Sequence, residues 1–129
     1  MAQDTLPTST LRISDSEYQQ RRERLAEHAR QQGAAAALVF EAPRVLYYSG
    51  FAFYPTERPV ALIVTAEAES HLFVPRLELE HARQEGFVEH VHHYDEYPRL
   101  EHPMQVLAQL LEREGLTGGS LVADHDGYP

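Results

Sequence analysis

Residues 88–102, VEHVHHYDEYPRLEH, form a stretch of this sequence that is dense in side chains that could do chemistry. Four histidines, four carboxylates and two tyrosines fall within these fifteen positions. Alternate residues of a β-strand share a face, so a strand here would place His90, His92 and Tyr94 on one side. The H-x-H spacing of His90 and His92 is the one by which a single strand can offer two imidazoles to zinc. The stretch therefore predicts either a metal site or a strand rich in titratable groups.

A catalytic zinc site needs a third protein ligand and an open position. His71, His102 or Asp95 could supply that ligand, but no spacing in the sequence selects one of them. Neither an HExxH motif nor a Cys/His tract is present. A half-exposed or edge strand with histidines at its polar positions explains the same residues without a metal. We expect no metal ion in this chain, with His90 and His92 as the candidates if one binds.

The second notable group is aromatic and lies in residues 47–54, followed by a proline and an arginine. Five aromatics in eight residues exceed what a surface loop needs, so part of the group is expected in the core. The rest predicts an exposed apolar patch of the kind that lines a pocket or an interface. Arg58 could meet a substrate carboxylate or make a surface ion pair. The candidate pocket and interface residues are Tyr47, Tyr48, Phe51, Phe53, Tyr54 and Arg58.

Other catalytic patterns are absent. The sequence has no phosphate-binding glycine loop, and the serine in YYSGF lacks the G-x-S-x-G framing of a nucleophile elbow. The carboxylate pairs Glu78/Glu80 and Glu112/Glu114 fall on predicted helices and are expected to be solvated. Asp124, His125 and Asp126 lie at the end of a predicted strand, and we interpret them as a turn.

Composition narrows the class of protein. The chain has 129 residues, 43% of them hydrophobic, which suits one packed domain. The net charge of −9 argues against nucleic acid, because binding phosphates needs clustered basic residues. There is no cysteine, no apolar run near the roughly 20 residues of a membrane span, and no secretory signal in the first residues. We expect a cytoplasmic protein with no membrane partner.

The chain predicts alternating helices and strands. Residues 14–33 form a helix that begins with the Ser14/Glu17 capping-box pattern and ends at Gly33, with its Arg, Glu and Gln face in solvent. Helical segments are also expected at 42–49 (a single turn), 76–86 and 103–115, and strands at 34–40, 60–65, 71–74, 87–94 and 119–124. Residues 60–75 read as a β-hairpin. This order implies an α/β fold, a mixed β-sheet flanked by helices.

The stretch EYQQRRERLAEHARQQGAAAALVFEAPRVLYYSGF resembles the start of the N-terminal domain of creatinase, prolidase and Xaa-Pro aminopeptidase proteins. Those domains open with an Arg-rich helix, a glycine stop, an apolar strand and a Tyr-Leu-Thr-Gly-Phe-like turn, here Tyr47 to Phe51. Pro43 and Arg44 stand where the family often has Pro and Asn. The order of the later elements continues the likeness over residues 14–129.

The resemblance implies a ribonuclease-H-like fold for residues 14–129, after a flexible segment at 1–13. It also implies a non-catalytic domain of a prolidase-like, metal-dependent Xaa-Pro dipeptidase or aminopeptidase. In such proteins two divalent ions (Mn, Co or Zn) bind to two Asp, one His and two Glu of a C-terminal pita-bread domain. The N-terminal domain caps the substrate pocket, often that of a partner subunit, and helps the protein to form dimers.

These family properties set our expectations for partners and for the limits of the chain. We expect a homodimer, a catalytic domain of the same protein and a proline-containing peptide as partners, and no hydrolysis by this chain alone. The sequence stops soon after its last predicted strand, so we expect a domain truncated at its C-terminal end. A stand-alone module for ligand binding or dimerisation, or a small histidine-based metalloprotein, remains open. The sequence does not decide between prolidase, aminopeptidase, creatinase and lyase chemistry.

Overall fold

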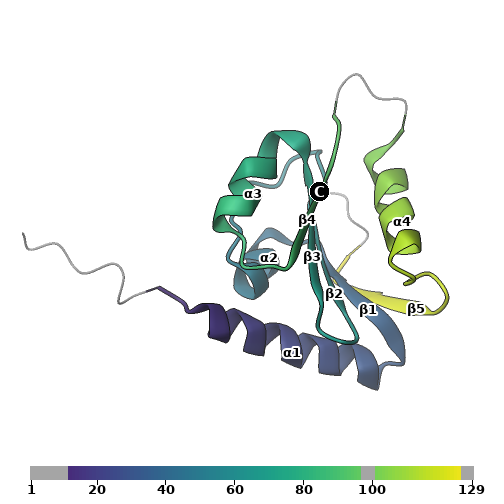
Figure 1. The fold of residues 1–129 in the computed structure, drawn as a ribbon. Coiled ribbons are helices and arrows are strands. Elements are labelled where there is room, and N and C mark those ends of the chain that lie inside the picture. Colours follow the sequence, from purple (N-terminus) through teal and green to yellow (C-terminus); the bar gives the residue numbers. More distant parts are fainter. Residues whose placement is uncertain (1–11, 97–100, 126–129) are drawn as a thin grey trace, which may run out of the picture.

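The computed structural model describes residues 12–96 and 101–125, so most of the predicted flexible segment 1–13, the loop at Pro98 and Asp126 lie outside the described part. The predicted order of helices and strands is confirmed (Figure 1). The helices are α1 (Asp15–Gln31), α2 (Ala42–Ser49), the short 3-10 turn η2 (Arg76–Glu78), α3 (Leu79–Glu85) and α4 (Pro103–Arg113). The strands are β1 (Ala34–Val39), β2 (Ala61–Thr65), β3 (Ser70–Pro75), β4 (His90–Tyr94) and β5 (Ser120–Ala123).

Local sequence signals account for where these elements begin and end. The Ser14 hydroxyl accepts a hydrogen bond from the Glu17 backbone N–H at 3.1 Å, as a helix N-cap does. The Glu17 side chain does not complete the capping box and instead accepts from Arg21 Nε at 3.0 Å. Gly33 ends α1 with a positive φ of 68°. α2 is a full eight-residue helix, longer than the predicted single turn, and β4 begins at His90, three residues later than predicted.

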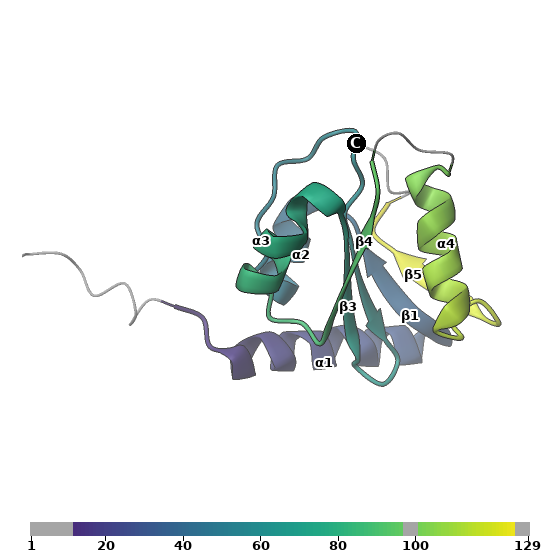
Figure 2. The same ribbon diagram turned by 45° about the horizontal axis from the view of Figure 1, so that its top comes forward.

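The five strands form one mixed sheet in the order β4-β3-β2-β1-β5. β2 is antiparallel to both of its neighbours, whereas β4 and β5 run parallel to β3 and β1. Four strands therefore point the same way, and their carboxyl ends meet at one edge, which lies at the top of the sheet in Figure 2. The predicted mixed sheet with flanking helices is confirmed, and this shared edge is where α/β folds commonly bind ligands.

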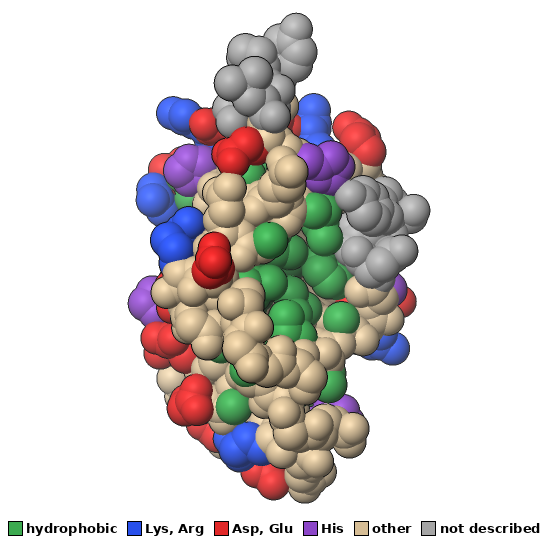
Figure 3. All heavy atoms as spheres, turned by 90° about the vertical axis from the view of Figure 1, so that its right-hand side faces the viewer, with side chains coloured by type: hydrophobic (Ala, Val, Ile, Leu, Met, Phe, Trp, Pro, Cys, Tyr) green, Lys and Arg blue, Asp and Glu red, His purple; other side chains and the backbone are tan. Residues whose placement is uncertain are grey.

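The two faces of the sheet are covered unequally. α1, α2 and α3 pack on one face over a core that includes Ala26, Leu62 and Val74. Among the described residues, α4 is the one helix that covers the other face, over a core that includes Ile63 and Phe73. Figure 3 shows this second face, on which apolar side chains stay visible in the space beside α4. Within the described residues no helix has both the length and the apolar character needed to cross a membrane.

Candidate functional site

The loop between α2 and β2 carries four of the six predicted pocket residues. We call residues 51–59 the aromatic loop, and Figure 2 shows it along the carboxyl edge of the sheet. Phe51, at its start, is fully buried in the core beneath α1, α2 and α3. Its ring lies 5.8 Å from that of Phe53 and 4.8 Å from the His81 ring. Phe51 therefore anchors the loop from inside the core.

The other aromatic residues lie progressively further out. Tyr48 and Phe53 are partly buried against the same core. Tyr47 is 46% exposed, and the Arg21 guanidinium lies 4.1 Å from the centre of its ring, within the range of a cation–π contact. Tyr54 is 91% exposed, so nearly the whole ring faces solvent. The group thus combines core packing and exposed aromatic surface.

Two hollows flank Arg58 at the carboxyl edge of the sheet. The larger, of about 330 Å³, is lined by residues that include Phe40, Phe53 and His125. The smaller, of about 130 Å³, is lined by residues that include Phe53, Tyr54 and Leu77. Arg58 lines both. The guanidinium pairs with Glu96, and its side chain remains 46% exposed. A substrate carboxylate that reached Arg58 would therefore compete with Glu96.

Buried contacts hold the end of the aromatic loop on the sheet. The Tyr94 hydroxyl donates a hydrogen bond to the Pro59 carbonyl at 2.9 Å, and its ring stacks on Phe73. Burial raises the pKa of Tyr94 far above its ordinary value, so the phenol stays a neutral donor. On the neighbouring strands, the Asp124 carboxylate accepts from the backbone N–H groups of Phe40 at 2.8 Å and Glu41 at 3.0 Å. Asp124 therefore ties β5 to the end of β1, a structural role that the sequence did not indicate.

Tyr94→Phe is expected to lower the free energy of unfolding by about 1–3 kcal/mol, because it leaves the buried Pro59 carbonyl without its donor. Urea unfolding measures the change. Tyr54→Phe is the matched control, since its exposed hydroxyl is expected to contribute less than about 0.5 kcal/mol. Equal stability of the two variants would show that the Tyr94 hydrogen bond does not hold the loop.

The histidines of β4 meet a third histidine from β3. His90 and His92 share a face of the sheet, as predicted, and His71 is paired with His90 in the parallel register of β3 and β4. The two other residues considered as a third ligand, His102 and Asp95, lie elsewhere. His102 caps α4, where its Nδ1 accepts from the Met104 N–H at 3.1 Å, and Asp95 pairs with Arg76 at 3.4 Å. Sequence reasoning named His71 only as one of three possibilities, because the strand register was unknown.

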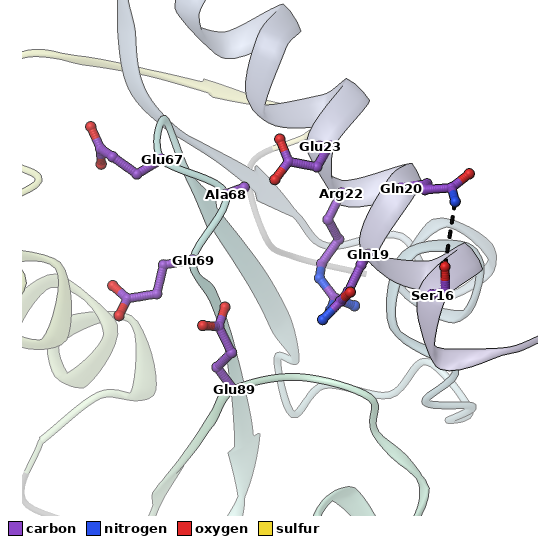
Figure 4. Close-up of a pocket in the computed structure, with 9 residues that line it drawn as sticks. All are labelled: Ser16, Gln19, Gln20, Arg22, Glu23, Glu67, Ala68, Glu69 and Glu89. Atoms are coloured by element: carbon purple, nitrogen blue, oxygen red, sulfur yellow. Dashed lines mark hydrogen bonds between the residues drawn. The ribbon is translucent and has the colours of Figure 1, made fainter.

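A polar hollow of about 670 Å³ separates α1 from the turn of the β2–β3 hairpin (Figure 4). Arg22 lines it although the sequence predicted a solvated face there, and only 4% of Arg22 is exposed. Its guanidinium donates to the Tyr48 carbonyl at 2.9 Å, and burial lowers the pKa of Arg22 below its ordinary value. Arg22 therefore connects α1 to the end of α2 beside the aromatic loop.

Comparison with known proteins places this fold in a family. The Creatinase/Prolidase N-terminal domain family matches residues 21–123. An uncharacterized peptidase of Staphylococcus saprophyticus is 34% identical over 65 residues, which are 50% of this chain and 19% of that protein. The chain thus spans about a fifth of the length of this relative.

Two solved structures show the same architecture. The N-terminal domain of Xaa-Pro dipeptidase from Lactobacillus brevis superposes with a TM-score of 0.72 at 22% identity, over 81% of this chain and 75% of that one. A recombinant prolidase from Thermococcus sibiricus superposes with a TM-score of 0.70 at 26% identity, over 87% of this chain and 29% of that one. With the family match over most of its length, the chain belongs to the creatinase/prolidase N-terminal domain family.

Proposed function

We propose that this domain caps the substrate pocket of a prolidase-like metallopeptidase and contributes to subunit association. The observation that carries the proposal is the aromatic loop, which places Tyr54 in solvent at 91% exposure next to Arg58. A large exposed aromatic ring leaves apolar surface in water unless a partner or ligand covers it. The similarity to an Xaa-Pro dipeptidase domain and to a prolidase indicates the class of substrate that the covered pocket would contain.

The residues of the loop suit a proline-containing peptide. The Tyr54 and Phe53 rings offer flat apolar surface on which a pyrrolidine ring can pack, and Arg58 supplies a cation for the peptide carboxylate. The domain would exclude water and position the substrate, while hydrolysis would occur in a separate catalytic domain. The two divalent ions (Mn, Co or Zn) that the family resemblance implies would bind in that domain.

Uncovered apolar surface supports the association role. Met104, Val106 and Leu121 are only partly buried on the face that α4 covers. Figure 3 shows apolar side chains reaching the surface beside α4. A second copy of the chain, or the catalytic domain, would bury this surface and gain roughly 25 cal/mol for each Å² of apolar area removed from water.

Tyr54→Ala, made in the protein that joins this chain to its catalytic domain, is expected to raise KM for an Xaa-Pro dipeptide about tenfold, equivalent to ~1.4 kcal/mol of lost binding. The melting temperature should not change, because the ring makes little contact with the domain itself. Leu46→Ala is the control, since Leu46 is 44% exposed on α2 and lines neither hollow beside Arg58. Unchanged KM values for both Tyr54→Ala and Arg58→Ala would exclude the capping role.

A further inference from the structure

Three side chains on the α4 side of the sheet converge beside the turn of the β2–β3 hairpin. Glu69 comes from the hairpin turn, His71 from β3 and His90 from β4. One ligand atom from each lies within 4.8 Å of the other two. The rings of His71 and His90 stack with centroids 4.6 Å apart, as their paired register requires. We call Glu69, His71 and His90 the histidine–glutamate cluster.

The spacing of these atoms fits a small divalent ion. Glu69 Oε1 lies 3.3 Å from His71 Nε2, and Glu69 Oε2 lies 3.2 Å from His90 Nε2. Ligands bound tetrahedrally at about 2.0–2.2 Å, as in zinc sites, are separated from one another by roughly 3.3–3.6 Å. Binding would replace the two hydrogen-bonding protons with one ion and would draw together ligand atoms that now lie within 4.8 Å of one another.

A neighbouring histidine holds the central ligand in the orientation that a metal needs. His71 is 1% exposed, and its Nδ1 lies 3.0 Å from His92 Nε2. In the metal-free cluster, Nε2–H of His71 donates to the Glu69 carboxylate. With the ion bound that proton would be absent, and Nδ1–H of His71 would donate to His92, so that the Nε2 lone pair is free for the ion. A ligating histidine in proteins commonly uses its second ring nitrogen in this way, which fixes the tautomer and the ring plane.

A second carboxylate lies close enough to complete the coordination. Glu114, the C-cap of α4, places Oε1 3.8 Å from His71 Nε2. Figure 4 shows that the Glu69 side chain points away from Arg22, so this carboxylate is not turned toward the buried guanidinium. Two imidazoles and two carboxylates, with no thiolate, form a donor set that suits zinc and balances its charge.

We propose that the histidine–glutamate cluster, with Glu114, binds one zinc ion that links the hairpin turn, β3, β4 and the end of α4. The ion would act as a structural cross-link, because four protein ligands leave no open position for a substrate. The site is separate from the aromatic loop and does not depend on the proposed capping function. Without the metal, the same residues form a hydrogen-bonded cluster.

The test is a zinc titration of the untagged, chelator-treated chain by calorimetry, with cobalt as a spectroscopic probe. We expect one ion per chain, a higher melting temperature with zinc, and the intense visible absorption of four-coordinate cobalt. His90→Gln and Glu69→Gln should each weaken zinc binding at least tenfold. His92→Gln, which keeps all ligands, should weaken it about 10- to 100-fold, as loss of a ligand-orienting partner does.

Matched controls come from the same strand and the same turn. His93→Gln, on the opposite, exposed face of β4, and Glu67→Gln, in the hairpin turn, should bind zinc like the unaltered chain. No stoichiometric binding, or equal weakening by His90→Gln and His93→Gln, would overturn the proposal. In the second case zinc would be bound by surface histidines alone.

Discussion

Phe51→Ala is expected to lower the free energy of unfolding by about 3–5 kcal/mol, because truncating a buried aromatic ring removes its packing and leaves a cavity. Phe51 is fully buried and contacts both Phe53 and His81. It stands where the chain leaves α2 and enters the aromatic loop, so its loss also releases the start of that loop. Urea unfolding at constant m-value measures the change in stability.

Tyr54→Ala is the control for this prediction, since it removes an aromatic ring from the same loop at a position that is 91% exposed. Its effect on stability should stay within about 0.5 kcal/mol, as for other surface substitutions. Comparison of the two variants separates the effect of losing the buried ring that anchors the loop from the effect of losing its exposed ring. Comparable losses of stability would mean that Tyr54 packs on the domain and is not available to a substrate.

Gly50→Ala is expected to cost about 2–4 kcal/mol, because it combines backbone strain with overpacking. Gly50 ends α2 with a φ of 80°, a conformation that residues with a Cβ rarely adopt. An added Cβ would lie 2.8 Å from Phe87 Cδ2 and 3.1 Å from Tyr18 Cζ, whose rings stack on one another. Thermal unfolding, together with urea unfolding, measures the loss.

Gly33→Ala distinguishes the two parts of that cost. Gly33 has a similar φ of 68°, but a Cβ there would meet no atom within 4 Å. Only the backbone strain remains, which is about 1–2 kcal/mol for a left-handed residue. If Gly33→Ala and Gly50→Ala destabilise the protein equally, the Tyr18 and Phe87 rings do not restrict position 50.

The sequence predicted the elements of this fold because their signals are local. Ser14 and Gly33 mark the ends of α1 through a side-chain cap and a positive φ, and both are visible in the residues themselves. The polar turn between two β-branched runs likewise predicted the β2–β3 hairpin. The alternation of helices and strands then indicated the α/β class and the mixed sheet.

The composition of the sites could not be predicted in the same way, because it depends on contacts between distant segments. His71 meets His90 only through the parallel pairing of β3 with β4, and no spacing in the sequence sets that register. Glu69, which joins them from the hairpin turn, was not among the predicted candidates. Arg22 looked like a solvated helix residue, yet it is buried where α1 meets the end of α2.

The aromatic group shows where composition alone stops being informative. Five aromatics in eight residues predicted both core and exposed surface, but not which residue does which. Phe51 is fully buried whereas Tyr54, three residues later, is 91% exposed, and the residue types alone do not distinguish the two positions.

Hydrolysis of an Xaa-Pro dipeptide by the purified 129-residue chain tests the central claim most directly. The measurement should be made with and without added manganese, and compared with the protein that also contains the catalytic domain. We predict no activity for the chain alone under either condition and metal-dependent activity when the catalytic domain is present. Hydrolysis that co-purifies with the isolated chain through successive columns would contradict the assignment of the chemistry to another domain.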